Sequence, residues 1–285
     1  MLPCFFVSDL HGKVERYARL FAAVREAPPQ AVFMGGDLLP HAFATLEGPD
    51  GQPEHFFAGY LARELGRLRD DLGDAYPRWL VILGNDDPRV EAEELRPLEG
   101  AGLLEHLPEK ATRLGDHPVF GYPFVPPTPF QLKDWERYDV SRFVDPGCVS
   151  PEEGARSVPV TPDEARYRTI AEDLENLTAD SDLSEAILLC HSPPYQGKLD
   201  RAALDGKMID YVPLDVHVGS IALQRFIEAR QPRLTLHGHE SARLTGGWQE
   251  QRGRTLCLSA AHDGPELALV RFDADDPRGA TRELR

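Results

Sequence analysis

The chain alternates between short apolar runs and polar segments, and five of the apolar runs end abruptly in polar residues. Each run is short and largely apolar, which predicts a strand buried on both faces. The five runs are residues 3–7, 31–34, 78–83, 186–190 and 233–236. Between the runs, apolar residues recur at helical spacing, so the pattern predicts alternating strands and helices in an α/β fold.

Helical spacing marks four segments, and two further apolar runs near the end of the chain predict two late strands. The helical segments are 14–24, 61–68, 161–177 and 219–227. The third begins with Thr161-Pro162-Asp163-Glu164, which has capping-box chemistry with proline at the first helical position. The late strands lie near 254–259 and 266–272. No internal repeat or long linker divides the chain, so we expect residues 1–285 to form one domain.

Side chains that suit a divalent metal follow each of the five runs. They are Asp9, His11, Asp37, Asn85, His191, His237 and His239. In an open α/β sheet the carboxyl ends of the strands face a ligand crevice, so the fold can bring these residues together. Nitrogen and oxygen ligands without sulfur favour Mn, Fe, Zn, Co or Ni. Seven ligands are too many for one ion, so the pattern predicts two ions that share one carboxylate.

Each of these motifs also has a simpler interpretation. Asp9 and His11 are compatible with a turn aspartate and a surface histidine, and Gly35-Gly36-Asp37 with a glycine turn and a capping aspartate. Asn85-Asp86-Asp87-Pro88 is typical of a turn that starts a helix. The metal interpretation depends on all five segments occurring together, each after a strand.

Composition and charge limit the classes of function. The formal net charge is −16, with no cluster of lysine and arginine, so we expect no binding to a nucleic-acid duplex. The four cysteines are scattered, which indicates a reducing cytoplasm without a disulfide framework. No signal peptide and no apolar run of about 20 residues is present, so we expect no membrane association.

The ordered set of motifs resembles the calcineurin-like metallophosphoesterases. The set is Asp-x-His at 9–11, Gly-Gly-Asp at 35–37, Gly-Asn-Asp at 84–86, His191 and His-x-His at 237–239. Four further segments resemble one bacterial subgroup of this family: Thr-Pro-Phe at 128–130, Asp-Trp-Glu at 134–136, His-Val-Gly-Ser at 217–220 and His-Gly-His-Glu-Ser at 237–241. The resemblance implies a single metallophosphoesterase domain, built as a four-layer αββα sandwich of two mixed β-sheets flanked by helices.

The resemblance also implies two metal sites and a reaction. Asp9, His11 and His239 would hold the first ion. Asn85, His191 and His237 would hold the second, and Asp37 would bridge the two. A hydroxide that bridges the two ions would then attack the phosphorus of a small phosphate ester.

Two positions depart from the family pattern. The family commonly has histidine after the motif asparagine, where it protonates the leaving group, but here Asp86 follows Asn85. We therefore expect a phosphodiester or a small nucleotide-like ester, with Asp86 or His217 as the acid. Leu236 stands where the family has glycine before its His-x-His. The alternative is a weakly active or inactive scaffold on the same fold, for which the substitution at Asp86 is the only support.

Three further expectations concern the substrate-binding residues and other classes of hydrolase. Asn85, Tyr122 and Phe124 are candidate substrate-binding residues, although the proline-rich aromatic segment that contains the two rings equally fits a rigid packed loop. Ser192 lacks the Gly-x-Ser-x-Gly elbow of a serine nucleophile. A peptidase-like or deaminase-like hydrolase is disfavoured, because the ligand order differs and no His-Glu-x-x-His helix is present.

Overall fold

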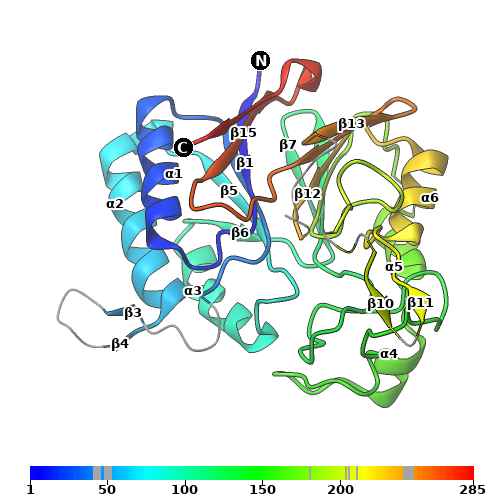
Figure 1. Cartoon of the computed structure of the whole chain (residues 1–285). Coiled ribbons are helices and arrows are strands. Elements are labelled where there is room, and N and C mark those ends of the chain that lie inside the picture. The colour runs from blue at the N-terminus through cyan, green and yellow to red at the C-terminus, as the bar shows by residue number, and fades with distance from the viewer. Residues whose placement is uncertain are drawn as a thin grey trace.

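The computed structural model describes residues 1–40, 46–47, 53–179, 181–202, 204, 206–209, 211–239 and 247–285. Two six-stranded sheets lie face to face, with helices on their outer surfaces (Figure 1). This arrangement confirms the predicted four-layer αββα sandwich. The amino group of Met1 pairs with Asp275, just after β15 (Ala268–Asp273), at 2.8 Å, whereas Arg285 at the other terminus exchanges backbone hydrogen bonds with Leu267, just before that strand.

The first sheet contains four parallel strands and two antiparallel ones. Its order is β16 (Thr281–Leu284), β15 (Ala268–Asp273), β1 (Pro3–Val7), β2 (Ala31–Gly35), β5 (Arg78–Ile82) and β6 (Glu105–His106). Strands β1, β2, β5 and β6 are parallel, and β15 and β16 complete the sheet in antiparallel pairs. The carboxyl ends of β1, β2 and β5 therefore lie at one edge.

The second sheet is also mixed. Its order is β13 (Gln249–Arg252), β14 (Thr255–Ser259), β12 (Leu234–His237), β9 (Ile187–Cys190), β8 (His117–Tyr122) and β7 (Lys110–Leu114). The four inner strands are parallel, and β13 and β7 are antiparallel edges. The crossover between the sheets, residues 260–267, joins β14 to β15.

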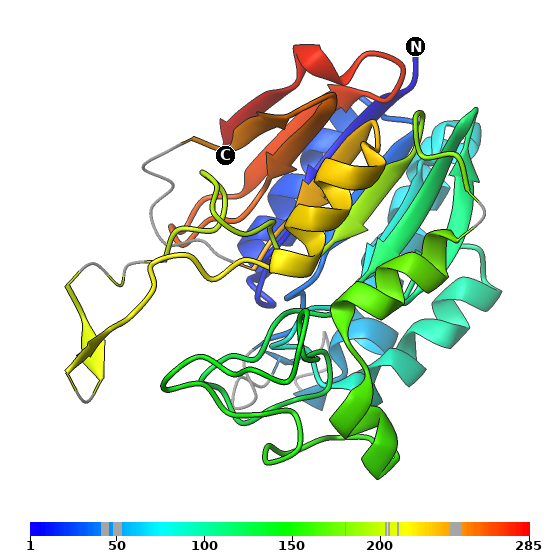
Figure 2. The same cartoon turned by 90° about the vertical axis from the view of Figure 1, so that its right-hand side faces the viewer.

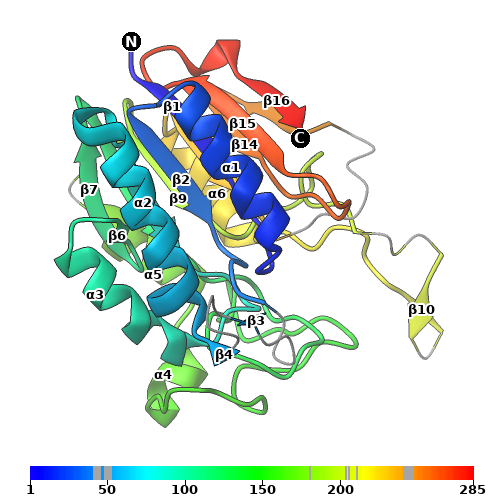
Figure 3. The same cartoon turned by 90° about the vertical axis from the view of Figure 1, so that its left-hand side faces the viewer.

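Helices cover the outer face of each sheet. On the first sheet lie α1 (Val14–Glu26), α2 (Ala62–Leu72) and α3 (Leu95–Gly100), and on the second lie α5 (Ile170–Thr178) and α6 (Ile221–Arg230) (Figures 1 and 3). The short α4 (Pro162–Tyr167) precedes α5, and a π-helical turn over Phe56–Leu61 leads into α2. None of the helices in the described ranges has the length and apolarity needed to cross a bilayer.

Alternation along the strands explains why the sequence shows continuous apolar runs. In β1, Cys4 and Phe6 join the core between the two sheets, whereas Phe5 and Val7 join the core beneath the helices. β2, β5 and β9 divide their side chains in the same way. Both faces of each central strand are therefore apolar, as expected for strands in the middle of a layered α/β fold.

The sequence pattern did not predict the polar edges of the fold. β13 has the sequence Gln-Glu-Gln-Arg and β16 is partly exposed, so neither has an apolar run. Two short hairpins, β3 (Leu46–Glu47) with β4 (Pro53–Glu54) and β10 (Met208–Ile209) with β11 (Val212–Pro213), also lie in segments expected to be loops. The β10–β11 hairpin projects away from the body of the molecule (Figures 2 and 3).

Candidate metal centre

Four of the predicted ligands have a left-handed backbone, which is uncommon for residues other than glycine. Their φ angles are 54° at Asp9, 46° at His11, 53° at Asp37 and 70° at His239. They lie just beyond the carboxyl ends of β1, β2 and β12. Such strain persists where the surrounding structure holds it, and it is concentrated at functional sites.

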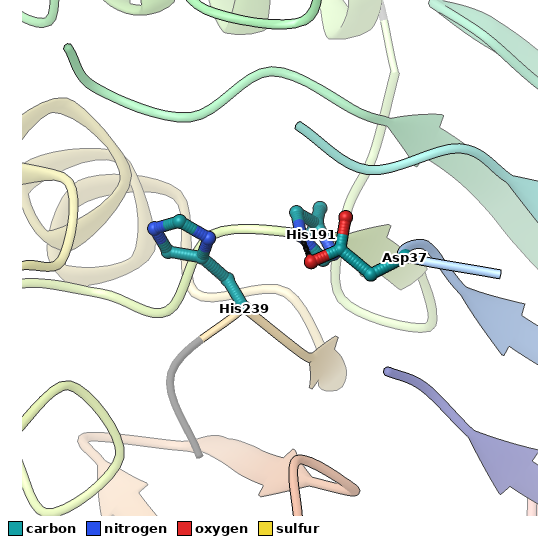
Figure 4. Close-up of side chains that lie close together, drawn as sticks. All are labelled: Asp37, His191 and His239. Atoms are coloured by element: carbon teal, nitrogen blue, oxygen red, sulfur yellow. Dashed lines mark ion pairs between the residues drawn. The ribbon is translucent and has the colours of Figure 1, made fainter. Parts of the chain in front are cut away.

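One group of candidate ligands comprises Asp37, His191 and His239, whose ligand atoms lie within 4.8 Å of one another. His191 Nε2 is 3.3 Å from Asp37 Oδ2, and the rings of His191 and His239 are 5.2 Å apart. Figure 4 shows the Asp37 carboxylate against the His191 ring, with His239 entering from a separate segment. Asn85 Oδ1 adds an oxygen 3.1 Å from His191 Nε2.

The orientation of His191 makes this group suitable for a cation. Its Nδ1 lies 2.7 Å from the carbonyl oxygen of Gly35 and donates to it, which leaves Nε2 toward Asp37 and Asn85. Nε2 and the two oxygens can all act as acceptors, an arrangement that suits a metal ion or a proton on Nε2. Burial alone would lower the pKa of His191, but the charge and hydrogen bond of Asp37 outweigh it and raise the pKa to about 10.

The second group comprises Asp9, His11 and Asp37, again with ligand atoms within 4.8 Å. Burial raises the pKa of Asp9 to about 7, although the charge of His191 opposes the rise. For Asp37 burial also acts upward, but His191 outweighs it and the pKa lies below its usual range. Asp37 belongs to both groups and therefore has the position that a bridging carboxylate requires.

Asp87, which the sequence interpretation left unassigned, fixes the distance between two of the ligand loops. Its buried carboxylate accepts hydrogen bonds from the backbone N–H groups of Leu38, Leu39 and Gly84 at 2.8 to 3.1 Å. The segment after Asp37 is thereby tied to the residue before Asn85. Two acids follow Asn85 in the sequence, and the presence of the second, Asp87, is the feature from which this role could have been predicted.

Glycines allow the ligand loops to approach closely. A Cβ atom on Gly84 would lie 2.2 Å from Asp37 Oδ1 and 2.6 Å from His191 Nε2. A Cβ atom on Gly238 would lie 2.8 Å from Asp9 Oδ2. Any side chain at these positions would therefore push ligand atoms apart.

His237 has a different position from the one expected of a ligand. Its Nδ1 is 2.8 Å from the carbonyl oxygen of Ser192, and its Nε2 is 2.7 Å from Thr235 Oγ1. Both ring nitrogens thus have protein partners, and His237 is in neither of the groups found among the described residues. Burial lowers its pKa to about 3, which fits a neutral core histidine.

His239 also lies with other candidate ligands than those expected. We expected it with Asp9 and His11, but its ring lies with Asp37 and His191, and only its backbone N–H contacts Asp9, at 3.0 Å from Oδ1. Gly238 directly precedes His239, whereas Leu236 precedes His237. Glu240 and Ser241, the last two residues of the His-Gly-His-Glu-Ser segment, lie outside the described residues.

The two candidate acids lie in different surroundings. Asp86 is beside the second group, with Oδ2 3.9 Å from His11 Nδ1, and its side chain is 31% exposed. His217 lies in the segment between β9 and α6, where its Nδ1 is 2.9 Å from Oδ1 of the buried Asp200. Asp200 is held in turn by the backbone N–H groups of Gln196 and Gly197.

Tyr122 and Phe124 are core residues rather than the exposed wall of a pocket. Each is 2% exposed. The Tyr122 hydroxyl donates to Asp173 at 2.9 Å, the Arg137 guanidinium lies 3.6 Å from the centre of the Phe124 ring, and Trp135 packs against that ring at 5.4 Å. Neither ring is available to stack on a substrate, so the packed-loop interpretation applies to both.

Comparisons with known proteins bear on the family and the fold of the chain. A family model described as calcineurin-like phosphoesterase matches residues 2–242. The comparison with curated proteins found no match. One solved structure is 15% identical and covers 99% of this chain and 98% of its own, with a TM-score of 0.60. The protein TT1561 of Thermus thermophilus is 16% identical with the same coverage and a TM-score of 0.56. At these identities the structural likeness shows the fold alone.

Proposed function

The chain belongs to the calcineurin-like phosphoesterase family, and from that premise we propose that it hydrolyses a phosphate ester at the edge where Asp37 lies, with two divalent cations. The observation that supports this most directly is that one buried carboxylate, Asp37, is shared by both candidate ligand groups. A shared carboxylate is the arrangement that keeps two cations about 3.5–4 Å apart.

The proposed ligand sets follow the contacts in the structure rather than the two sets that the family resemblance implies. Asp37, Asn85, His191 and His239 form one set, and Asp9, His11 and Asp37 form the other. We leave His237 out, because both of its ring nitrogens are engaged within the protein. When bound, divalent cations of the Mn, Fe, Zn, Co or Ni class polarise the phosphoryl group and lower the pKa of a water molecule.

Asp86, which lies beside the second ligand group, bears on the choice of substrate. Asp86 is close to His11 and partly exposed, and it places a carboxyl group where the family commonly has a proton-donating imidazole. A weak proton donor limits turnover of esters with basic leaving groups. We therefore favour a phosphodiester or nucleotide-like ester with an acidic leaving group.

His217 is the second candidate for the proton donor. Its Nδ1 faces the buried carboxylate of Asp200, which fixes the ring and leaves Nε2 to exchange a proton with a ligand. If His217 has this role, His217→Asn will remove one limb of the pH profile. If Asp86 has it, Asp86→Asn will steepen the dependence of rate on the leaving group.

The test measures turnover of bis(p-nitrophenyl) phosphate and p-nitrophenyl phosphate by protein loaded with Mn²⁺. We expect faster turnover of the diester, and loss of turnover and of bound metal in Asp37→Asn. Asp71→Asn is a matched control, because Asp71 is an exposed partner of Arg25. No turnover of either ester by protein that holds two metal ions would refute the proposal.

A metal-poor scaffold is the second candidate, and the observation that favours it is Asp86 in place of the usual histidine. The two candidates differ in metal content. A catalytic protein will hold close to two ions per chain after loading, whereas a scaffold will hold almost none, as measured by elemental analysis of desalted protein.

A further inference from the structure

A buried arginine lies beside the second ligand group. Arg16 is on α1 and is 2% exposed, whereas Glu15 and Arg19 on the same helix are exposed. Its Nη1 donates to the carbonyl oxygen of Asp9. Its Nη2 donates to the carbonyl oxygen of His262 at 3.0 Å and also to that of Gly264. One guanidinium thus joins the loop after β1 to the crossover between the sheets.

The hydrogen bond from Arg16 is made to a residue, Asp9, whose backbone conformation is strained. Asp9 has a φ of 54°, and its N–H donates to the carbonyl oxygen of Gly36 at 2.9 Å. Since Arg16 donates to the carbonyl oxygen of Asp9, the N–H and the C=O group of Asp9 are both hydrogen-bonded. The direction of the Asp9 carboxylate depends on this backbone, because a left-handed residue directs its side chain differently from an extended one.

The crossover has supports of its own and can therefore serve as a fixed base. Arg282 donates to the carbonyl oxygen of Ala261 at 2.8 Å, and His262 Nε2 is 2.9 Å from the Glu266 carboxylate. Arg19, one turn after Arg16 on α1, donates to the carbonyl oxygen of Pro265 at 3.3 Å. The Arg16 contacts therefore join Asp9 to an anchored segment.

We propose that Arg16 is a positioning residue that holds Asp9 in the geometry required for a cation at Asp9, His11 and Asp37. The inference rests on the proposed function, since it assumes that these residues bind a metal. A guanidinium suits this task because its planar fork spans carbonyl groups from two segments, whereas a lysine ammonium is a point charge. Partners that orient ligands in this way typically change metal affinity by about 10- to 100-fold.

The test compares Arg16→Lys with Arg25→Lys, a matched change on the same helix at an exposed arginine that pairs with Asp71 on α2 rather than with the crossover. Mn²⁺ binding is measured by calorimetry, and the electron paramagnetic resonance spectrum of the bound ions is recorded. We expect Arg16→Lys to weaken one of two binding steps by about tenfold or more and to replace the spin-coupled spectrum with that of isolated Mn²⁺. Arg25→Lys should leave both unchanged.

The other outcomes have distinct meanings. Equal weakening of both steps, or no change in either, would overturn the positioning role of Arg16. Failure of the unmodified protein to bind Mn²⁺ would instead overturn the proposed function. If Arg16→Lys does not fold, Arg282→Lys decides the question, because it loosens the crossover without contacting Asp9. Selective weakening of one step is expected there, and unchanged binding would contradict the inference.

Discussion

Replacing Gly84 by alanine tests whether the close approach of the ligand loops matters for metal binding. The added Cβ would lie 2.2 Å from Asp37 Oδ1, 2.5 Å from Asp37 N and 2.6 Å from His191 Nε2. Ordinary contact begins near 3.4 Å, so the loops would have to separate by about 1 Å. Because one of the clashing atoms belongs to the backbone, a rotamer change alone cannot relieve the overlap.

The expected magnitude has two parts. Overpacking of this kind typically costs about 1–3 kcal/mol of folding free energy. A misplacement of about 1 Å at a reacting centre lowers rates by about 100-fold. We therefore expect Gly84→Ala to fold with reduced stability in urea, to lose at least about tenfold in Mn²⁺ affinity by calorimetry, and to lose most of its turnover.

Gly66→Ala is the matched control, because a Cβ at Gly66 on α2 would meet nothing within 4 Å. Alanine there should stabilise the helix by about 0.5–1 kcal/mol and leave metal binding unchanged. The same chemical change thus has opposite signs at the two glycines. The reasoning would be refuted if Gly84→Ala bound Mn²⁺ with the stoichiometry and affinity of the parent protein.

Three further predictions concern individual side chains. His239→Asn should reduce bound Mn²⁺ in elemental analysis, whereas His237→Asn should retain it and lose about 1–3 kcal/mol in urea unfolding, since its buried partners become unpaired. At pH 8, below the His191 pKa of about 10, Mn²⁺ binding should release a proton from His191, which calorimetry in buffers of different ionisation enthalpy detects. Phe124→Leu should lower stability without changing KM, because that ring is buried beneath Arg137.

The strand ends could be predicted because two physical rules act together at them. A strand buried on both faces must be apolar throughout, so a polar residue marks the point where it leaves the core. Parallel strands then bring those points to one edge. Asp37 lies within reach of both Asp9 and His191 for this reason, although Asp9 and His191 are 182 positions apart in the chain.

The sequence pattern could not distinguish between two residues of the same type that lie two positions apart. His237 and His239 both come at the end of β12, and the sequence alone gave no reason to prefer one as the partner of His191. Pairing with Cys190 across β9 places His237 inside the sheet, and its side chain takes partners there. The same limitation applies to Tyr122 and Phe124, whose burial depends on Arg137 and Asp173 from other segments.

The charges at this edge give a physical reason for expecting cations there. Asp9, Asp37 and Asp87 are all buried, and burial raises the pKa of both Asp9 and Asp87 to about 7. The pKa of His191 is raised, because the charge and hydrogen bond of Asp37, together with the charge of Asp9, outweigh the effect of burial. Protons are thus held where ligand atoms converge, and isolated buried charges are otherwise strongly unfavourable. A divalent cation can replace those protons and satisfy several acceptors at once, so metal affinity should rise with pH across the range in which these groups lose their protons.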